Sequence, residues 1–270
     1  MVGDVHYKGL GWIGLISFLL LGCYERQEGC LDALANNFDL DADRNCCCTY
    51  PNLIFDVKHL MDTVNLNPNT MYTNDLGQSF EIRKLDFFIS GARLTKDGVD
   101  FMAGDSLLIE LTVGSVEIVI MDIIRLNKNQ FQYTLGVFKE PGNFDRLKFF
   151  TGLKEPLSGA VPGQFETGSP LFEPGNPLLD DQLGYLNFSI ELARDTTDEH
   201  VFQLKSHTPL ELVEIDLELQ VEKNKGRNLV ILLDIDYYQW FRDLDLEGDP
   251  VEVMREKIRE GISHSFSVSN

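Results

Sequence analysis

Cysteine is the residue type in this chain with the widest choice of chemistry, and all five cysteines lie before residue 49. Cys23 ends an apolar run, and four others follow it: Cys30, Cys46, Cys47 and Cys48. An even number of cysteines in an oxidising compartment predicts two disulfides. Because a bond between adjacent cysteines is strained, we expect at least one of the clustered three to pair with Cys30. A zinc site is the alternative, although the usual C-x-x-C separation is missing.

A run of alternating oxygen ligands lies between these cysteines. Side chains at every second position can converge on one hard cation, and here they are Asp39, Asp41, Asp43 and Asn45. We therefore predict a calcium site, with a solvated acidic turn as the alternative. The run is not an EF-hand, because Arg44 stands where that loop needs a glycine. A second acidic run, Asp243 to Asp249, is predicted to be a solvated loop with a helix cap, and calcium binding is the alternative.

Histidines are the remaining candidates for metal binding. Copper(I) favours imidazole, thioether or thiolate ligands. His200 and His207 flank one predicted strand, so a weak copper site there is the hypothesis, and scattered exposed histidines are the alternative. Copper is thus disfavoured as a cofactor, and calcium is favoured over it. The sequence contains no G-x-S-x-G or H-E-x-x-H motif and no phosphate-binding glycine loop, so we predict that the protein is not an enzyme.

The first 22 residues are typical of a secretory signal. An uncharged, mostly apolar run from Gly9 to Leu21 follows Lys8 and is shorter than the ~20 residues that span a bilayer. Its end, Leu20-Leu21-Gly22-Cys23, resembles a bacterial lipobox, in which cleavage leaves the cysteine to carry a diacylglycerol. We therefore predict lipid on Cys23 and an outer-membrane lipoprotein that faces the periplasm or the outside. An ordinary cleaved signal is the alternative.

Charge limits the partners of the folded body. The chain has 270 residues, 23 Lys and Arg against 43 Asp and Glu, and a net charge of −20. Nucleic acid needs clustered Lys and Arg, so we exclude it as a partner. Attachment to a membrane is expected through the lipid and not through the acidic surface.

Period-two patterning predicts strands through most of residues 52–270. In Val213–Val221 every odd position is apolar and every even position is polar, so one face must be buried. Val116–Ile124 and Leu229–Ile235 are mostly apolar, as central strands would be. With the turn signals between such stretches, the pattern predicts an all-β fold, an antiparallel two-sheet sandwich.

Two segments depart from the strand pattern. Asp249 and Pro250 precede a stretch of helical spacing, which predicts one short helix over Val251–Ile262. Residues 153–183 hold five of the ten prolines and form a long connection, which is either functional or a passive excursion. The predicted organisation is a signal peptide at 1–22, a cysteine-stapled segment at 23–51 and a sandwich domain at 52–270.

Two stretches of the sequence resemble known families. Gly29-Cys30-Leu-Asp32, with Ala35, Asn37 and the later cysteines, resembles a short cysteine-stapled segment that is common in secreted Bacteroidetes proteins. Over residues 52–270 the chain resembles the MbnP-like family. The motifs are Tyr72-x-Asn74-x-x-Gly77-x-x-Phe80-x-Ile82, Asn143-Phe144-Asp145, Gly184-Tyr185, and Leu229–Asp236 running into Trp240-Phe241.

The second resemblance implies an extracytoplasmic β-sandwich and, in some relatives, copper held by histidines and a tryptophan oxidised to kynurenine. It also implies a di-haem cytochrome of the peroxidase type as a partner. The ligand positions do not carry over well. The family's W-x-W stretch falls at Leu178–Leu183, which has no Trp, and the histidine of its F-x-x-H strand falls at Lys205. Trp240, in a run typical of a core, is not expected to form kynurenine.

The sequence thus favours a lipid-anchored envelope binding protein of MbnP-like type. Its partner would be a metal ion or a di-haem peroxidase-like protein, with the copper positions degenerate. The alternative is a structural or adhesive surface module that binds glycan or protein through residues 153–183 and is stabilised by disulfides and calcium.

Overall fold

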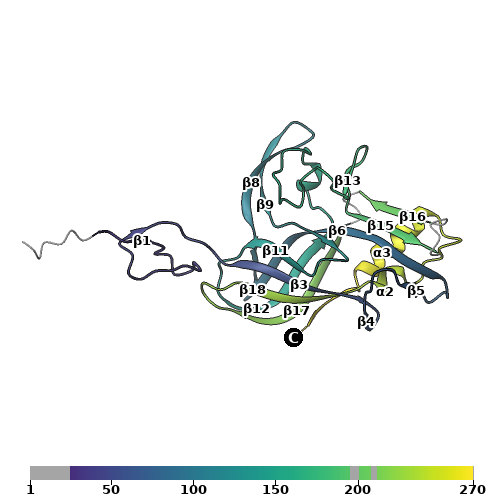
Figure 1. Ribbon diagram of the computed structural model, residues 1–270, viewed down its shortest axis with the longest axis horizontal. Coiled ribbons are helices and arrows are strands. Elements are labelled where there is room, and N and C mark those ends of the chain that lie inside the picture. Colours follow the sequence, from purple (N-terminus) through teal and green to yellow (C-terminus); the bar gives the residue numbers. More distant parts are fainter. Residues whose placement is uncertain (1–24, 195–200, 208–211, 270) are drawn as a thin grey trace, which may run out of the picture.

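The computed structural model describes residues 25–194, 201–207 and 212–269, and its main body is a sandwich of two β-sheets (Figure 1). The larger sheet has eight strands, all paired antiparallel, and its path runs β16-β15-β6-β12-β17, with three short strands beside β6. Its strands are β5 (Met71–Thr73), β6 (Ser79–Lys96), β7 (Val99–Met102), β10 (Ile124–Asn127), β12 (Gly142–Thr151), β15 (Phe188–Ala193), β16 (Val201–Ser206) and β17 (Val213–Lys223).

The smaller sheet has five strands along the path β11-β3-β18-β19, with β4 paired to β3. They are β3 (Asn52–Met61), β4 (Val64–Asn65), β11 (Gln132–Val137), β18 (Leu229–Asp236) and β19 (Phe266–Ser269). The all-β sandwich is therefore confirmed. One pairing differs from the antiparallel expectation, because β3 and β18 run parallel. Most of the chain separates these two strands, which leaves room for the crossover that a parallel pair requires.

The space between the sheets is filled by large apolar side chains. Phe87 of the larger sheet stacks edge-on against Trp240, which has no exposed area, and Phe55 of the smaller sheet meets Phe149 at 6.1 Å between ring centroids. The alternation predicted for β17 is confirmed, since Ile215 and Leu219 point into this core. Burial of such rings dominates the stability of a domain that has no disulfide of its own.

Two helices close one end of the sandwich. The predicted helix is confirmed as α3 (Val251–Ile262), which buries Met254 and Ile258, and α2 (Tyr238–Phe241) precedes it. Pro250 is the residue before α3, but Asp249 does not cap the helix. Its carboxylate instead accepts a hydrogen bond from the backbone of Asp245. In the described part of the chain, no helix has the length and apolar character that a membrane crossing needs.

The prediction that Val116–Ile124 is a central strand is wrong. Val116–Met121 is β9, which pairs only with β8 (Asp105–Glu110) in a two-stranded sheet. One face of this hairpin is exposed, with Leu108 at 63% and Ile118 at 74% of their full exposure. An apolar run predicts burial from composition alone, and here only the other face, with Ile109 and Val119, is buried.

Residues 153–183 are the cover of the larger sheet rather than a free excursion. They contain a 3-10 turn, η1 (Leu157–Gly159), and the strand β13 (Leu179–Asp180), which pairs with β14 (Gly184–Tyr185). With the β8–β9 hairpin they form a second apolar core on the outer face of β6 around Phe88. We call residues 153–183 together with β8 and β9 the roof; Figure 1 shows it on the side of the large sheet away from the helices.

Candidate functional site

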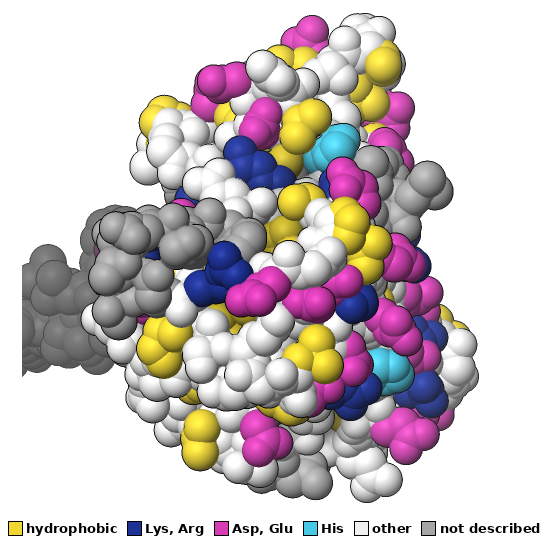
Figure 2. Space-filling model, turned by 90° about the vertical axis from the view of Figure 1, so that its right-hand side faces the viewer, with side chains coloured by type: hydrophobic (Ala, Val, Ile, Leu, Met, Phe, Trp, Pro, Cys, Tyr) yellow, Lys and Arg dark blue, Asp and Glu magenta, His cyan; other side chains and the backbone are white. Residues whose placement is uncertain are grey.

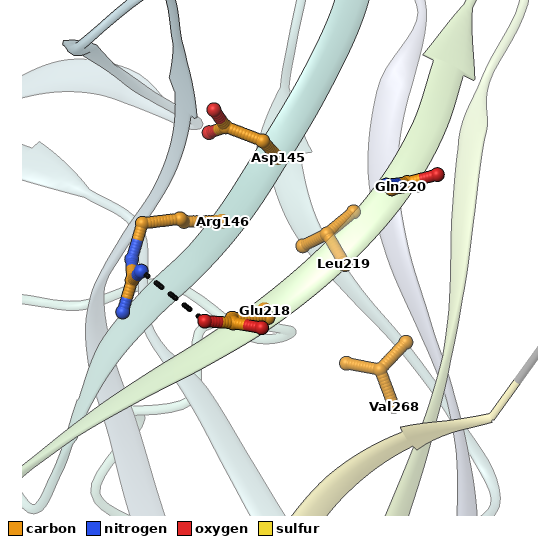
Figure 3. A pocket seen from close by; sticks show the side chains of 6 residues that line it. All are labelled: Asp145, Arg146, Glu218, Leu219, Gln220 and Val268. Carbon is orange, nitrogen blue, oxygen red and sulfur yellow. Dashed lines mark ion pairs between the residues drawn. The ribbon is translucent and has the colours of Figure 1, made fainter.

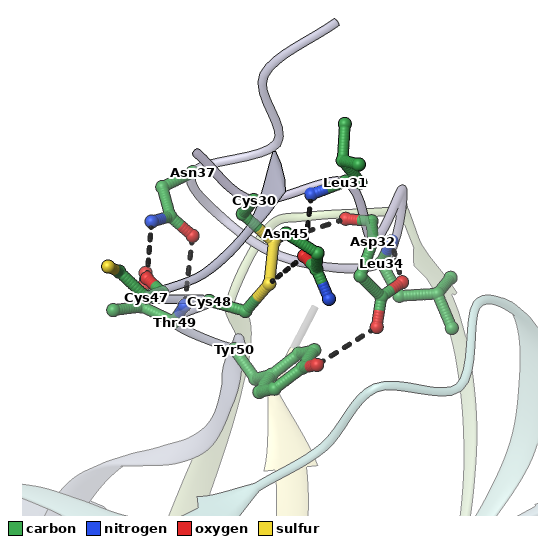
Figure 4. Close-up of a disulfide and its surroundings, with 10 residues drawn as sticks. All are labelled: Cys30, Leu31, Asp32, Leu34, Asn37, Asn45, Cys47, Cys48, Thr49 and Tyr50. Carbon is green, nitrogen blue, oxygen red and sulfur yellow. Dashed lines mark hydrogen bonds between the residues drawn. A yellow bond between two sulfur atoms is a disulfide. The ribbon is translucent and has the colours of Figure 1, made fainter. Parts of the chain in front are cut away.

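The N-terminal segment of the described chain is closed by one disulfide (Figure 4). Cys30 is bonded to Cys48, with the two Cα atoms 4.9 Å apart, so the predicted pairing of Cys30 with the clustered cysteines is confirmed. The second predicted disulfide is absent from the structure, because Cys46 and Cys47 are free thiols. Once Cys48 is used, the two remaining cysteines are neighbours in the chain, and a bond between neighbours is strained.

Asn37 holds the backbone turn at Cys47 in place (Figure 4). Its amide nitrogen donates to the carbonyl of Cys47 and its amide oxygen accepts from the backbone N–H of Thr49, each at 2.8 Å. Cys47 has the left-handed φ of 56° that this turn requires. A hydrogen bond with Cys47 raises the pKa of Cys46 to about 11, so Cys46 is a protonated, weakly nucleophilic thiol at neutral pH.

The predicted calcium ligands lie on one loop, and their oxygens are used by the local backbone. Asp39 accepts a hydrogen bond from the N–H of Asp41 at 2.9 Å, and Asp43 accepts one from the N–H of Gln27 at 3.0 Å. Asn45 accepts from the N–H of Leu31 at 2.9 Å. Among the residues that the structure describes, no three His, Cys, Asp or Glu side chains form a group that could hold a metal. Calcium binding stays a prediction.

The second acidic run already has a cation of its own. Lys257 of α3 donates to the Asp249 carboxylate at 2.5 Å and to the carbonyl of Asp243 at 2.7 Å. The carboxylate of Asp245 accepts from Gln78 and from the backbone N–H groups of the loop, and these contacts lower its pKa. The loop is thus built around an ammonium group.

The structure describes one of the two histidines predicted as copper ligands. His200 lies outside the described residues. His207 is half-buried at the end of β16, and its buried Nδ1 has no hydrogen-bond partner among the residues that the structure describes. His59 is structural, because its two ring nitrogens bond the Tyr237 hydroxyl and the Gln130 carbonyl, each at 2.8 Å. Trp240 is structural too, since its indole N–H donates to Ser265 in the core.

Polar side chains cross the outer face of the larger sheet in a single row, and the strand register places them side by side. Ser189 of β15 stands between Lys205 of β16 and Asp86 of β6, and Asp86 stands opposite Asn127 of β10. We call these four residues the polar row. Ser189 and Asp86 are buried, although they lie on the face of the sheet that would be exposed to solvent without the roof. Burial raises the pKa of Asp86, and the charges of Lys84 and Arg125 partly offset this effect.

An ion pair ties the roof to the polar row. The Lys205 ammonium lies 3.0 Å from Asp180 Oδ2, and the other oxygen of Asp180 accepts from the backbone N–H groups of Gln182 and Leu183. These hydrogen bonds, first that from Gln182 and then that from Lys205, lower the pKa of Asp180 to about 2. The carboxylate is therefore ionised at every physiological pH, and both of its oxygens are occupied.

This pair bears on the copper site that the family resemblance implies. Lys205 stands where the resemblance expects a histidine, and Asp180 belongs to the stretch where it expects tryptophans. A protonated ammonium has no lone pair to give to a metal, and copper prefers nitrogen or sulfur donors to a hydrogen-bonded carboxylate. The donor set at this position does not fit copper.

Two hollows open on the surface beside these elements. The larger, about 630 Å³, lies between β12, β17 and β19, where two residues of β17, Leu219 and Gln220, face the single residue Asp145. Its cation is matched, since Arg146 pairs with Glu218 across the groove (Figure 3) and with Asp216 at 2.8 Å. The smaller, about 340 Å³, lies under the roof, between β10, β11 and residues 168–175. Figure 2 shows acidic and basic side chains interspersed over one face of the protein.

The cysteines, the helix and residues 153–183 stand out in the sequence, whereas the polar row does not. The signal was present in the strand at residues 79–96, where Asp86 interrupts an apolar run. A charged residue in such a strand indicates a face covered by polar partners. Its neighbours Ser189 and Asn127 are distant in sequence, so only the sheet register reveals the row.

Comparisons with known proteins identify the family. The family model described as MbnP matches residues 50–255. A solved structure, MbnP from Methylosinus trichosporium, is 11% identical to this chain, with a TM-score of 0.46 over 80% of this chain and 97% of that one. Among curated proteins, none matches the chain. Because the family match covers well over half of the sequence, this protein belongs to the MbnP family.

Proposed function

We propose that this chain is an extracytoplasmic binding protein, anchored to an envelope membrane by lipid on Cys23, that recognises its partner through the roof and the sheet face below it. The observation that carries the proposal is the Lys205–Asp180 ion pair at 3.0 Å. It replaces the donors expected for copper and at the same time fastens the roof to the sheet. The proposed activity is therefore binding rather than catalysis or copper chemistry.

The build of the roof supports a role in recognition. Buried apolar residues from both of its parts, among them Ile109, Val119 and Leu171, hold it on the sheet, so it is a fixed surface rather than a loose loop. Rigid surfaces bind with a lower entropic cost than segments that must be ordered first. Above this core, the hairpin leaves Leu108 and Ile118 exposed side by side, as protein-binding surfaces do.

Copper analysis tests the proposal. Protein purified from the envelope is expected to retain no stoichiometric copper after dialysis, whereas Lys205→His is expected to bind copper more tightly, because an imidazole replaces the ammonium near His207. Lys84→His is the matched control, a histidine on the same sheet face but on β6. Stoichiometric copper in the unaltered protein, lost on His207→Ala, would overturn the proposal.

The anchor has its own test. Mass spectrometry of the mature protein is expected to find a diacylglycerol on an N-terminal Cys23, and Cys23→Ser is expected to release the protein from the membrane fraction. An unlipidated mature chain that remains in the membrane would contradict the anchored form of the proposal. A di-haem peroxidase-like protein is the proposed redox partner, and copurification from a cross-linked envelope is the measurement that would find it.

The adhesive surface module remains the second candidate function, and the exposed face of the β8–β9 hairpin favours it. It requires calcium at Asp39, Asp41, Asp43 and Asn45 to stabilise the stapled segment. A melting temperature that rises with calcium, and no longer rises after Asp41→Asn, would support this function. An unchanged melting temperature would leave only the first candidate.

A further inference from the structure

The cavity of about 340 Å³ under the roof has the size of a small-molecule site. Its floor is formed by β10 and β11, through Ile124, Arg125 and Tyr133, and its rim by residues 168–175 of the roof. Phe172 and Pro170 give it an apolar patch on the roof side, and polar groups of Gln130, Thr134 and Ser169 line much of the rest. A single charged group beside an apolar patch suits a ligand that carries one charge on an apolar body.

The charge in this cavity is Arg125, and among the described residues no carboxylate lies within ion-pair distance of it. Six other arginines are half-buried among the described residues, and each has a carboxylate within 4.0 Å: Arg83, Arg93, Arg146, Arg194, Arg255 and Arg259. Arg125 has no such partner in the described chain. In a protein with 43 acidic residues, a half-buried arginine without a carboxylate is an exception.

The guanidinium of Arg125 is held in place by a neutral group. Its Nη1 donates to the amide oxygen of Asn176 at 3.2 Å, and Asn176 is itself buried. Asn176 donates to the Pro170 carbonyl and accepts from the N–H of Leu178, so its orientation is fixed by the roof. A guanidinium has five N–H donors, and this contact leaves a pair of donors for a ligand.

We propose that this cavity binds a carboxylate on an apolar stem, with Arg125 pairing its two oxygens and Phe172 and Ile124 packing on the stem. Planar, bidentate pairing is the geometry that distinguishes arginine from lysine. The carboxylate is either that of a free small acid or the C-terminus of an apolar peptide. The inference deepens the proposed function, because the cavity opens on the proposed recognition surface. Copper analysis tests the proposed function and ligand titration tests this cavity, so the failure of one proposal can be distinguished from the failure of the other.

Calorimetric titration of the full mature protein tests the proposal, with phenylacetate as the small acid and Ala-Ala-Phe as the peptide. Saturable binding of at least one is expected, with phenylacetamide or the amidated peptide binding about tenfold or more weakly, since a hydrogen bond to a charged group is lost. Binding of only the acid assigns a free acid as the ligand, and binding of only the peptide assigns a chain terminus. Binding of neither probe overturns the proposal.

Variants locate the site. Arg125→Gln is expected to weaken binding about tenfold or more, and Arg125→Lys to restore it only in part, because the ammonium keeps the charge without the paired donors. Phe172→Ala removes the contact with the apolar stem. Because Phe172 is half-exposed, this variant is expected to fold, and it tests the site even if the arginine variants misfold. Arg146→Gln, in the other hollow, is the matched control and is expected to bind as the unaltered protein does. Equal affinity in all four variants would contradict the assignment.

Discussion

The outer face of the larger sheet has two halves that treat charge differently. The half over β12, β17 and the β6–β7 hairpin is open to water. Its cations pair across strands with carboxylates, as Arg146 does with Asp216 and Arg93 with Asp100. The half over β15 and β10 lies under the roof. There Asp86 is buried, and Arg125 forms no ion pair with a carboxylate of the described chain. The open half pairs its cations with its own carboxylates, and the covered half leaves the Arg125 guanidinium available to a ligand.

The two halves show how structural charges differ from functional ones in an acidic protein. On the open half, exposed pairs contribute little to stability and mainly keep an edge strand soluble. Beneath the roof, a charged group is costly unless it has a use, because burial penalises the ionised form. Unpaired charge under a cover is therefore a better indication of a site than charge density on the surface.

The largest expected effect is on the core under the roof. Phe88→Ala removes a ring with no exposed area that stacks edge-on against Tyr185, and we expect a loss of about 3–5 kcal/mol in the free energy of unfolding. Phe150→Ala, on the same outer face but half-exposed under Arg93 and Lys154, is the matched control and should cost clearly less. Chemical denaturation measures both. Equal losses would mean that the two halves do not differ in packing.

The next effect depends on pH. Asp122, which joins β9 to β10, is 4% exposed, and burial raises its pKa from 3.8 to about 6. A folded-state pKa above the unfolded value means that this group stabilises the fold fully below about pH 4 and loses that contribution as the pH rises through 6. Asp122→Asn should remove this dependence. We expect the stability difference between the two proteins to change by roughly 2 kcal/mol from pH 4 to 7. A stability difference that does not change with pH would show that folding leaves the pKa of Asp122 unchanged.

The smallest effect belongs to the open half. A double-mutant cycle on Arg146 and Asp216, both about 40% exposed, should give a coupling of about 0.2–1 kcal/mol that falls as salt is added. Thermal denaturation at two ionic strengths measures it. A coupling of several kcal/mol, independent of salt, would make the open half as energetically significant as the covered one.

Much of the fold could be predicted from the sequence, because period-two alternation is a local property. The strand at Val213–Lys223 and the helix at Val251–Ile262 follow from side-chain spacing alone. The β8–β9 hairpin could not be predicted correctly, because an apolar run does not say which other segment covers it. Here the cover comes from residues 153–183, whose apolar side chains are separated by prolines and show no period.

The candidate site was less predictable than the fold. Asp180 and Lys205 are 25 residues apart, and Arg125 meets Asn176 from 51 residues away, so neither contact leaves a pattern in sequence. The disulfide was predictable in part, because five cysteines in one short segment limit the choices. Which of three adjacent cysteines bonds to Cys30 depends on the turn held by Asn37, a tertiary detail.

The most direct test of the distinction between the two halves is a map of backbone amide shifts during a titration with phenylacetate. We expect saturable shifts confined to β10, β11 and residues 168–175, around Arg125. Shifts centred instead on the groove between β12, β17 and β19, around Arg146, would contradict it, as would a spectrum that phenylacetate leaves unchanged.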